Sequence, residues 1–463
     1  MKMVYGVNDK PKFGKLVIFA FQQLLAIMAA TIAVPAIINS NMGVDMSASA
    51  ALFGAGAGTI IYQLFTKFKS PVFLGSSFAF IGSMCAAFAG AASASIGYLG
   101  IIIGAILAGL VYVIIAIIIK IAGVNWINKL MPPVVIGPTV ALIGLSLAGA
   151  AVKDAVSYAN TDSNGSFIMT SNAWASLVCA LVTLLVVVLC STYGKKMAKL
   201  IPFIIGILSG YAVAGVFTII GFAAGKPSLI ILDIAPFQAL VENGLSLSTF
   251  LQIPDFTIVK GFGSIKDVDL TYIATVAVAY IPVAFVVFAE HIADHKNLST
   301  IIEKDLLEEP GLSRTLLGDG VGSMVGAVFG GCPNTTYGES VGCVAITRNA
   351  SVATITCTAV IALLISFISP FVAFLDSIPG CVMGGVCITL YGFIAVSGLK
   401  MIQKVDLEKS ANLFTASVIL ITGIGGLALA IGKVTITAIA TALILGIIVN
   451  IILTRKKEEE VTE

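Results

Sequence analysis

Long apolar runs, each separated from the next by a short polar stretch, repeat along the whole chain. A helix that crosses the hydrocarbon core of a bilayer needs about 20 mostly apolar residues. The pattern predicts fourteen such spans, beginning near residues 15, 47, 72, 97, 133, 172, 200, 270, 316, 335, 351, 381, 411 and 434. The runs near 72, 316 and 335 are short and are interrupted by glycine, serine, threonine or proline. The sequence therefore predicts an all-α polytopic membrane protein with a few broken spans.

The positions of the positive charges orient these spans. With the N-terminus inside and an even number of spans, all but five of the 26 Lys and Arg residues fall in cytoplasmic segments. The five exceptions are Lys153, Lys226, Lys260, Lys266 and Lys433. Because Lys and Arg are enriched in cytoplasmic loops, we expect a multi-pass protein of the cell membrane with both termini in the cytoplasm.

Composition excludes the soluble classes. Hydrophobic residues make up 58% of the 463 residues and charged residues only 11%, whereas soluble domains carry about 25% charged residues. A soluble enzyme, a nucleic-acid binder and a secreted domain are therefore excluded. The eight cysteines form no CxxC pair of the kind found in zinc or redox sites, so we expect buried thiols and no structural disulfide. The first apolar run lacks a convincing cleavage site and is interpreted as a retained span.

Two polar segments divide the spans into halves. Residues 151–171 and 224–269 are predicted to be extracellular loops, and the second leaves seven spans on either side. An odd number of spans in each half places the halves upside down relative to each other, which is the inverted-repeat plan of many secondary transporters.

Acidic residues inside spans mark the candidate site. All but four of the 24 Asp and Glu residues fit loops or span ends, and the exceptions are Glu290, Asp294, Asp319 and Glu339. A charge in the membrane costs roughly 2.5–3.5 kcal/mol on insertion scales, so such residues mark functional positions. We expect Glu290 and Glu339 to bind a polar substrate, a proton or both; the alternative is that they cap helix ends near water.

The segment around Glu339 is irregular. Gly330, Gly331 and Pro333 interrupt a regular helix, and the residues at 334–336 (Asn-Thr-Thr) have good N-cap character for a helix that begins there. The third span, PVFLGSSFAFI at 71–81, is broken in the same way and occupies the corresponding position in the first half. Interrupted spans in corresponding positions indicate a substrate site at the midplane, although two ordinary short helices remain the alternative.

The only two histidines of the chain lie beside two of these acids. Glu290 and Asp294 are four residues apart and share one helical face, while His291 and His295 share another. A His/carboxylate metal site is conceivable, and a solvated helix end is the simpler interpretation of the histidines.

The sequence PNTTYGESVG at 333–342, followed by VAITR at 344–348, resembles the signature of the nucleobase–ascorbate transporters in the form carried by uracil permeases. The resemblance covers nearly the whole chain. Supporting matches are LGSSFAFI at 74–81, AEHI at 289–292, KDLL at 304–307 with PGL at 310–312, and GGV at 384–386 with LYG at 390–392.

The resemblance implies a fold of fourteen spans in two inverted seven-span repeats, with short antiparallel strands in spans 3 and 10. Residues 1–150 would hold the first half of a core domain (spans 1–4) and then span 5 of a gate domain, and residues 151–269 spans 6–7 of the gate. Residues 270–370 would form the second half of the core (spans 8–11), and residues 371–463 the second half of the gate (spans 12–14) with a cytoplasmic tail. A homodimer in membrane lipid is also implied.

The resemblance further implies a proton-coupled uracil importer that works by alternating access. Substrate contacts would come from Glu290, Glu339, the backbone near Phe78 and Gly338, and the nearby Tyr337 and Tyr391. Burial favours the protonated form of a carboxyl group, so Glu290, with Asp294, is expected to carry the coupling proton. No cofactor is expected beyond this coupling ion, H+.

Two departures from the family pattern bear on coupling. Gln22-Gln23 stand where many relatives have Gln-His, and Asp294 stands where some relatives have a histidine. A histidine relay at that position is therefore in doubt. One alternative is a xanthine or other purine importer, although such relatives usually have Gln where this chain has Glu339, which favours uracil. A second is an anion transporter of the same fold, which the paired carboxylates disfavour. A third is a membrane enzyme, for which the sequence shows no nucleophile–base pair.

Overall fold

The computed structural model describes residues 3–123, 126, 131–195, 197–242, 244–431 and 434–460. The chain is mostly helical, and each predicted span begins within about four residues of the start of a helix or strand. Eight helices of the described residues are long and apolar enough to cross a membrane, α6 with α7 counting as one. They are α1 (Phe13–Met42), α2 (Ala48–Phe65), α4 (Ala94–Ala122), α6–α7 (Pro133–Ala155), α8 (Ser171–Tyr193), α10 (Pro202–Ala224), α14 (Leu270–Ile302) and α19 (Gly380–Ile402).

The remaining predicted spans contain helices that are shorter or less apolar. These are α3 (Ile81–Ala89), α15 (Leu312–Gly330), α16 (Gly338–Thr347), α17 (Val352–Ile365), α20 (Ser410–Ile424) and α21 (Ala438–Glu460). Local signals define several ends: the Ser47 hydroxyl accepts a hydrogen bond from the Ala50 amide at the start of α2, and the Asp269 carboxylate accepts one from Tyr272 at the start of α14. Gly331, with a φ of 74°, ends α15 in the left-handed conformation that glycine favours.

The third and tenth predicted spans each begin with a strand. Strand β1 (Leu74–Ser76) pairs with β4 (Asn334–Thr336) in antiparallel register, with Gly75 opposite Thr335. The strands expected in these two spans are therefore confirmed. The N-cap role predicted for residues 334–336 is wrong: they form β4, and Tyr337, which makes no side-chain cap, precedes the helix. Pairing with β1 satisfies the backbone groups of residues 334–336 and keeps them extended, so the helix begins only at Gly338.

Close helix packing supports this strand pair. A Cβ atom at Gly54 would lie 2.5 Å from the carbonyl oxygen of Gly326, so only glycine allows α2 and α15 to approach this closely. The Asn334 side chain fills the same junction and donates from Nδ2 to the Gly54 carbonyl over 3.0 Å. The contact fixes β4 against both helices.

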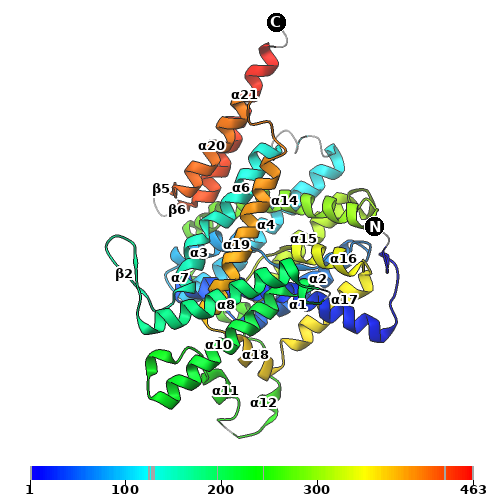
Figure 1. Cartoon of the computed structure of the whole chain (residues 1–463). Coiled ribbons are helices and arrows are strands. Elements are labelled where there is room, and N and C mark those ends of the chain that lie inside the picture. The colour runs from blue at the N-terminus through cyan, green and yellow to red at the C-terminus, as the bar shows by residue number, and fades with distance from the viewer. Residues whose placement is uncertain are drawn as a thin grey trace.

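The helices pack as two sets, here called set A and set B. Set A comprises α1–α4 and α14–α17, in which α15 packs on α2 and α4 and α17 on α1 and α2. Set B comprises α6–α8, α10 and α19–α21, in which α19 packs on α6, α7 and α8. In Figure 1, α20 and α21 project beyond the other helices at one end of the molecule, and α11 (Ala235–Ala239) and α12 (Leu247–Phe250) lie at the other.

The two segments predicted as loops contain regular structure. Residues 151–155 complete α7 (Ala148–Ala155), and a hairpin of β2 (Asn160–Thr161) and β3 (Phe167–Ile168) follows. The longer segment holds α11, α12 and α13 (Thr257–Phe262), and α13 packs on α4. The predicted domain boundary at residue 150 lies inside α7, and the predicted boundary at residue 370 lies inside α18 (Ser369–Asp376).

Candidate functional site

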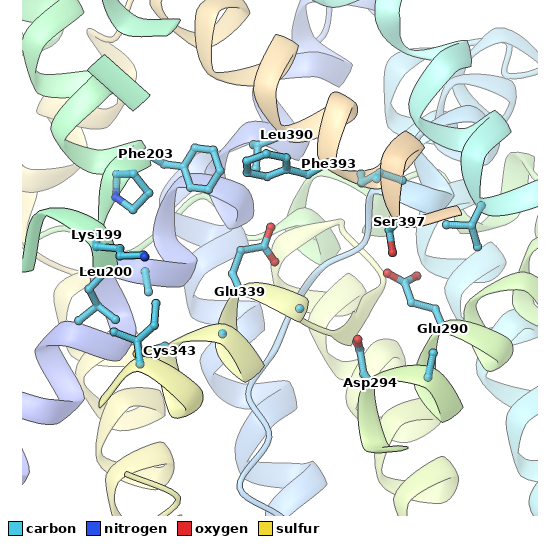
Figure 2. Close-up of a pocket in the computed structure, with 18 of the residues that line it drawn as sticks. Lys199, Leu200, Phe203, Glu290, Asp294, Glu339, Cys343, Leu390, Phe393 and Ser397 are labelled. Carbon is cyan, nitrogen blue, oxygen red and sulfur yellow. The ribbon is translucent and has the colours of Figure 1, made fainter. Parts of the chain in front are cut away.

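A cavity of about 430 Å³ lies between the two sets of helices, within the usual range for small-molecule sites. Set A contributes Glu290, Asp294 and Glu339, and set B contributes an apolar wall that includes Phe203, Leu390 and Phe393. Figure 2 shows the carboxylate of Glu339 near the middle of the view and that of Glu290 to its right, with Ser397 above Glu290. The cavity therefore joins acceptor groups on one wall to ring and aliphatic surfaces on the other.

Two of the carboxylates come from α14. Glu290 and Asp294 are one helical turn apart, so both side chains face the cavity. The Asp294 Oδ2 atom accepts a hydrogen bond of 2.7 Å from Thr336 Oγ1 at the end of β4. The cavity wall of α14 is thereby tied to the strand pair.

The third carboxylate belongs to the first turn of α16. Gly338 and Glu339 are the first two residues of this helix, and both line the cavity. The first four N–H groups of a helix lack intrahelical partners, and the helix dipole adds partial positive charge there. A ligand at this position meets hydrogen-bond donors from the backbone and acceptors from the side chains.

A smaller cavity of about 60 Å³ adjoins the first and shares Glu290, Gly338 and Glu339 with it. Phe78 and Tyr337 line this smaller cavity. The Tyr337 hydroxyl donates to the Ser76 carbonyl over 2.7 Å, so it braces β1. The expected aromatic and backbone positions thus lie beside the carboxylates.

Tyr391 is the exception among the expected contact residues. It is 2% exposed and lines neither cavity. Its ring packs edge to face on Phe78, with 6.0 Å between the centroids. Its place is behind Phe78, where it supports that ring.

The two histidines are completely buried, so their interpretation as a solvated helix end is wrong. His291 Nδ1 lies 2.7 Å from Asp319 Oδ2, and His291 Nε2 lies 3.0 Å from Thr315 Oγ1. His295 Nδ1 donates to the His291 carbonyl over 2.8 Å, and its Nε2 lies 2.7 Å from the Tyr62 hydroxyl. Contacts with α2 and α15 bury this face of α14.

These contacts place the four acids found by sequence in two locations. Glu290, Asp294 and Glu339 line the cavity, whereas Asp319 is paired inside set A. Among the described residues, no group of three or more His, Cys, Asp and Glu side chains is arranged to hold a metal ion.

Several lining and supporting residues were missed by sequence reasoning. Gln23 on α1 is buried and donates from Nε2 to Ser340 Oγ over 2.7 Å, directly beside Glu339. Ser397, Phe203 and Phe393 approach the cavity from set B. A lone serine or phenylalanine in an apolar span carries no local signal, although the unusual Gln22-Gln23 pair did mark its segment.

The sequence is similar to that of known permeases. Residues 14–432 match the Permease family that covers xanthine and uracil permeases. The uracil permease of Bacillus caldolyticus is 39% identical over 98% of this chain and 95% of its own length. The uracil permeases of Bacillus subtilis and Escherichia coli K12 are 38% and 34% identical, over 99% and 96% of this chain and 97% and 93% of their own lengths.

The fold is similar to that of two solved membrane transporters. The transmembrane domain of the cyanobacterial bicarbonate transporter BicA superimposes with a TM-score of 0.61 at 14% identity, covering 96% of this chain and all of that domain. The murine anion transporter Slc26a9 in its inward-facing state gives a TM-score of 0.64 at 11% identity, covering 97% of this chain and 69% of that one. At these identities the likeness concerns the fold.

Proposed function

This chain belongs to the Permease family, the nucleobase–ascorbate transporters, and from this premise we propose that it carries uracil into the cell by proton-coupled alternating access. The observation that carries the proposal is the meeting of Glu290 and Glu339 with the N-terminus of α16 in one cavity. The names of the three similar permeases support uracil as the substrate. As permeases, these relatives are transporters, not enzymes.

The chemistry of the cavity suits a pyrimidine. Uracil presents two N–H donors and two carbonyl acceptors in one plane. An ionised carboxylate accepts hydrogen bonds and cannot donate them, whereas a backbone N–H group donates and cannot accept. Glu290 and Glu339 would accept from the ring N–H groups, and the amides near Gly338 and Phe78 would donate to the carbonyls. The apolar wall of set B would cover the ring face.

The architecture proposed for transport has fourteen spans in two inverted repeats. Set A would be the core domain that holds the substrate, and set B the gate domain against which it moves. The pairing of β1 with β4 supports this, because it joins the third span of one half to the third span of the other. Lys199, predicted to be cytoplasmic, lines the cavity, which supports an inward-facing arrangement of the two sets.

Coupling is proposed to depend on the carboxylates of α14. In this scheme a proton taken up from outside neutralises Glu290, whose carbonyl oxygen can still accept from a ring N–H group. Substrate then binds, and the core domain moves against the gate domain. Charge neutralisation lowers the cost of carrying the site through an apolar interface. Asp294, held by Thr336, would be the second proton-coupling position. We also propose a homodimer in the cell membrane with both termini in the cytoplasm.

Uptake into proteoliposomes tests the proposal. An inwardly directed proton gradient is expected to drive accumulation of labelled uracil, and Glu290→Gln and Glu339→Gln are expected to abolish it. Wild-type uptake in both variants would refute the assignment. Competition by excess xanthine tests the purine alternative. If xanthine inhibits uptake as strongly as unlabelled uracil does, a purine becomes the preferred substrate.

An anion transporter of the same fold is the second candidate. The N-terminus of α16 would suit an anion, but three carboxylates in the same cavity would repel one. Sulfate or bicarbonate flux that uracil does not affect would favour this candidate.

A further inference from the structure

A second groove, of about 520 Å³, lies beside the candidate substrate cavity. The two spaces share Ala293 of α14 and Met401 of α19, so they adjoin at these two helices. The groove is bounded by α14 of set A and by α6 and α19 of set B, together with Met131 just before α6. An occupant would therefore touch both sets of helices at once.

The groove is apolar along its length and basic at one end. Met131, Ile136, Phe288 and Ile292 form the apolar wall, and Lys296 and Lys404 line the groove near the C-terminal ends of α14 and α19, together with the polar Asn297 and Thr300. Phe288 and Lys296 are eight residues apart on α14, which corresponds to about 12 Å along the helix axis. An elongated molecule with an apolar body and an anionic head matches this division.

The two lysines are exposed and lack acidic partners within the described part of the chain. The neighbouring cytoplasmic acids have other partners: Glu309 pairs with Lys69 and Lys304, and Asp406 with Lys409. Asp294, the acid of α14 next to the groove, accepts a hydrogen bond from Thr336 on the cavity side. The basic end is thus left with two unneutralised positive charges.

We propose that this groove binds an anionic phospholipid of the cytoplasmic leaflet, an inference that rests on the membrane orientation of the proposed function. The phosphate contacts Lys296 and Lys404, and the upper part of one acyl chain lies along Phe288 and Ile292. Basic pockets between membrane helices on the cytoplasmic side bind anionic headgroups in this way. Because the lipid bridges α14 to α6 and α19, it stabilises the arrangement of the two sets seen here.

Thermal denaturation of the purified full-length protein in a neutral detergent tests this site. Phosphatidylglycerol is expected to raise the melting temperature in a concentration-dependent manner, and phosphatidylcholine with the same acyl chains to raise it much less. The double variant Lys296→Gln/Lys404→Gln is expected to need roughly 30-fold more phosphatidylglycerol for the same rise, at about 1 kcal/mol per lysine.

A matched control separates the groove from general charge attraction. Lys67→Gln/Lys120→Gln removes two exposed positive charges outside the groove and is expected to respond like the wild type. Equal responses of both double variants, or equal effects of the two lipids, would overturn the proposal. A full rise with inorganic phosphate alone would also overturn it, because the site would then take a free anion.

The same samples keep this inference distinct from the proposed substrate. Uracil is expected to stabilise the Lys296→Gln/Lys404→Gln variant as it does the wild type, because neither lysine lines the substrate cavity. A missing uracil response with an intact lysine-dependent lipid response would contradict the proposed substrate and support the lipid site.

Discussion

Thr336 Oγ1 donates a hydrogen bond of 2.7 Å to Asp294 Oδ2, joining the last residue of β4 to the cavity face of α14. Thr336 is 1% exposed, so water cannot easily replace it. The contact connects α14, which presents Glu290, to the strand that leads directly into α16, which presents Glu339. The relative positions of these two carboxylates therefore depend on a hydroxyl that touches neither of them.

Thr336→Val preserves the shape of the side chain and removes this donor. The partly buried carboxylate of Asp294 then loses a partner, at a cost of about 1–3 kcal/mol. We expect a lower melting temperature and reduced uracil uptake. Thr336→Ser should restore both, since it keeps the hydroxyl, and wild-type uptake in Thr336→Val would show that the contact has no part in transport.

Asp319→Ala should be among the more destabilising single changes in the chain. It leaves His291 buried without its hydrogen-bond partner at 2.7 Å, and an unsatisfied buried polar group typically costs about 1–3 kcal/mol. A double-mutant cycle of denaturation midpoints with His291→Ala measures the coupling. Strictly additive losses would mean that the pair contributes no interaction of its own.

Gly54→Ala tests the close approach of α2 and α15. The added Cβ would lie 2.5 Å from the Gly326 carbonyl oxygen, so the helices must separate; overpacking of this kind costs about 1–3 kcal/mol. Gly392→Ala is the matched control, because nothing lies within 4 Å of a Cβ there. We expect a lower melting temperature only for Gly54→Ala, and equal melting temperatures would contradict the packing described here.

The ion pairs of Glu309, which lies outside the membrane-spanning segments, predict that its contribution to stability depends on pH. Lys69, 2.5 Å away, and Lys304 lower the pKa of the Glu309 carboxyl group. A lowered folded-state pKa means that the contribution to stability is present above the ordinary Glu pKa of about 4.3 and is lost as the pH falls through the lowered value. The difference in melting temperature between wild type and Glu309→Gln should therefore persist at pH 7 and shrink below about pH 4. A difference that does not change with pH would exclude the ion pairs as its cause.

Much of the fold is predictable because its signals are local. A run of about 20 apolar residues is sufficient to predict a spanning helix, and the predicted starts follow the observed helices closely. Glycine and proline around Gly331 and Pro333 mark the break in the tenth predicted span. The rarity of charge in these runs made Glu290, Asp294 and Glu339 visible, and all three line one cavity.

The remaining features depend on partners far away in the sequence. The N-cap predicted at residues 334–336 was wrong because β1, some 260 residues earlier, pairs with that segment. The contacts of His291 with Asp319 and of Gln23 with Ser340 join separate helices. Neither contact can be predicted from the periodicity of a single helix. Each depends on which helices are neighbours, and the hydrophobic pattern does not give that information.

Uracil binding to the purified protein tests the central claim most directly. Uracil at 100 times its dissociation constant is expected to stabilise the wild type by about 2.7 kcal/mol. Glu339→Gln is expected to need at least tenfold more uracil for the same rise in melting temperature, because hydrogen bonds to charged groups contribute about 1.5–3 kcal/mol. A wild-type uracil response in both Glu339→Gln and Glu290→Gln, or no response in the wild type, would contradict the account.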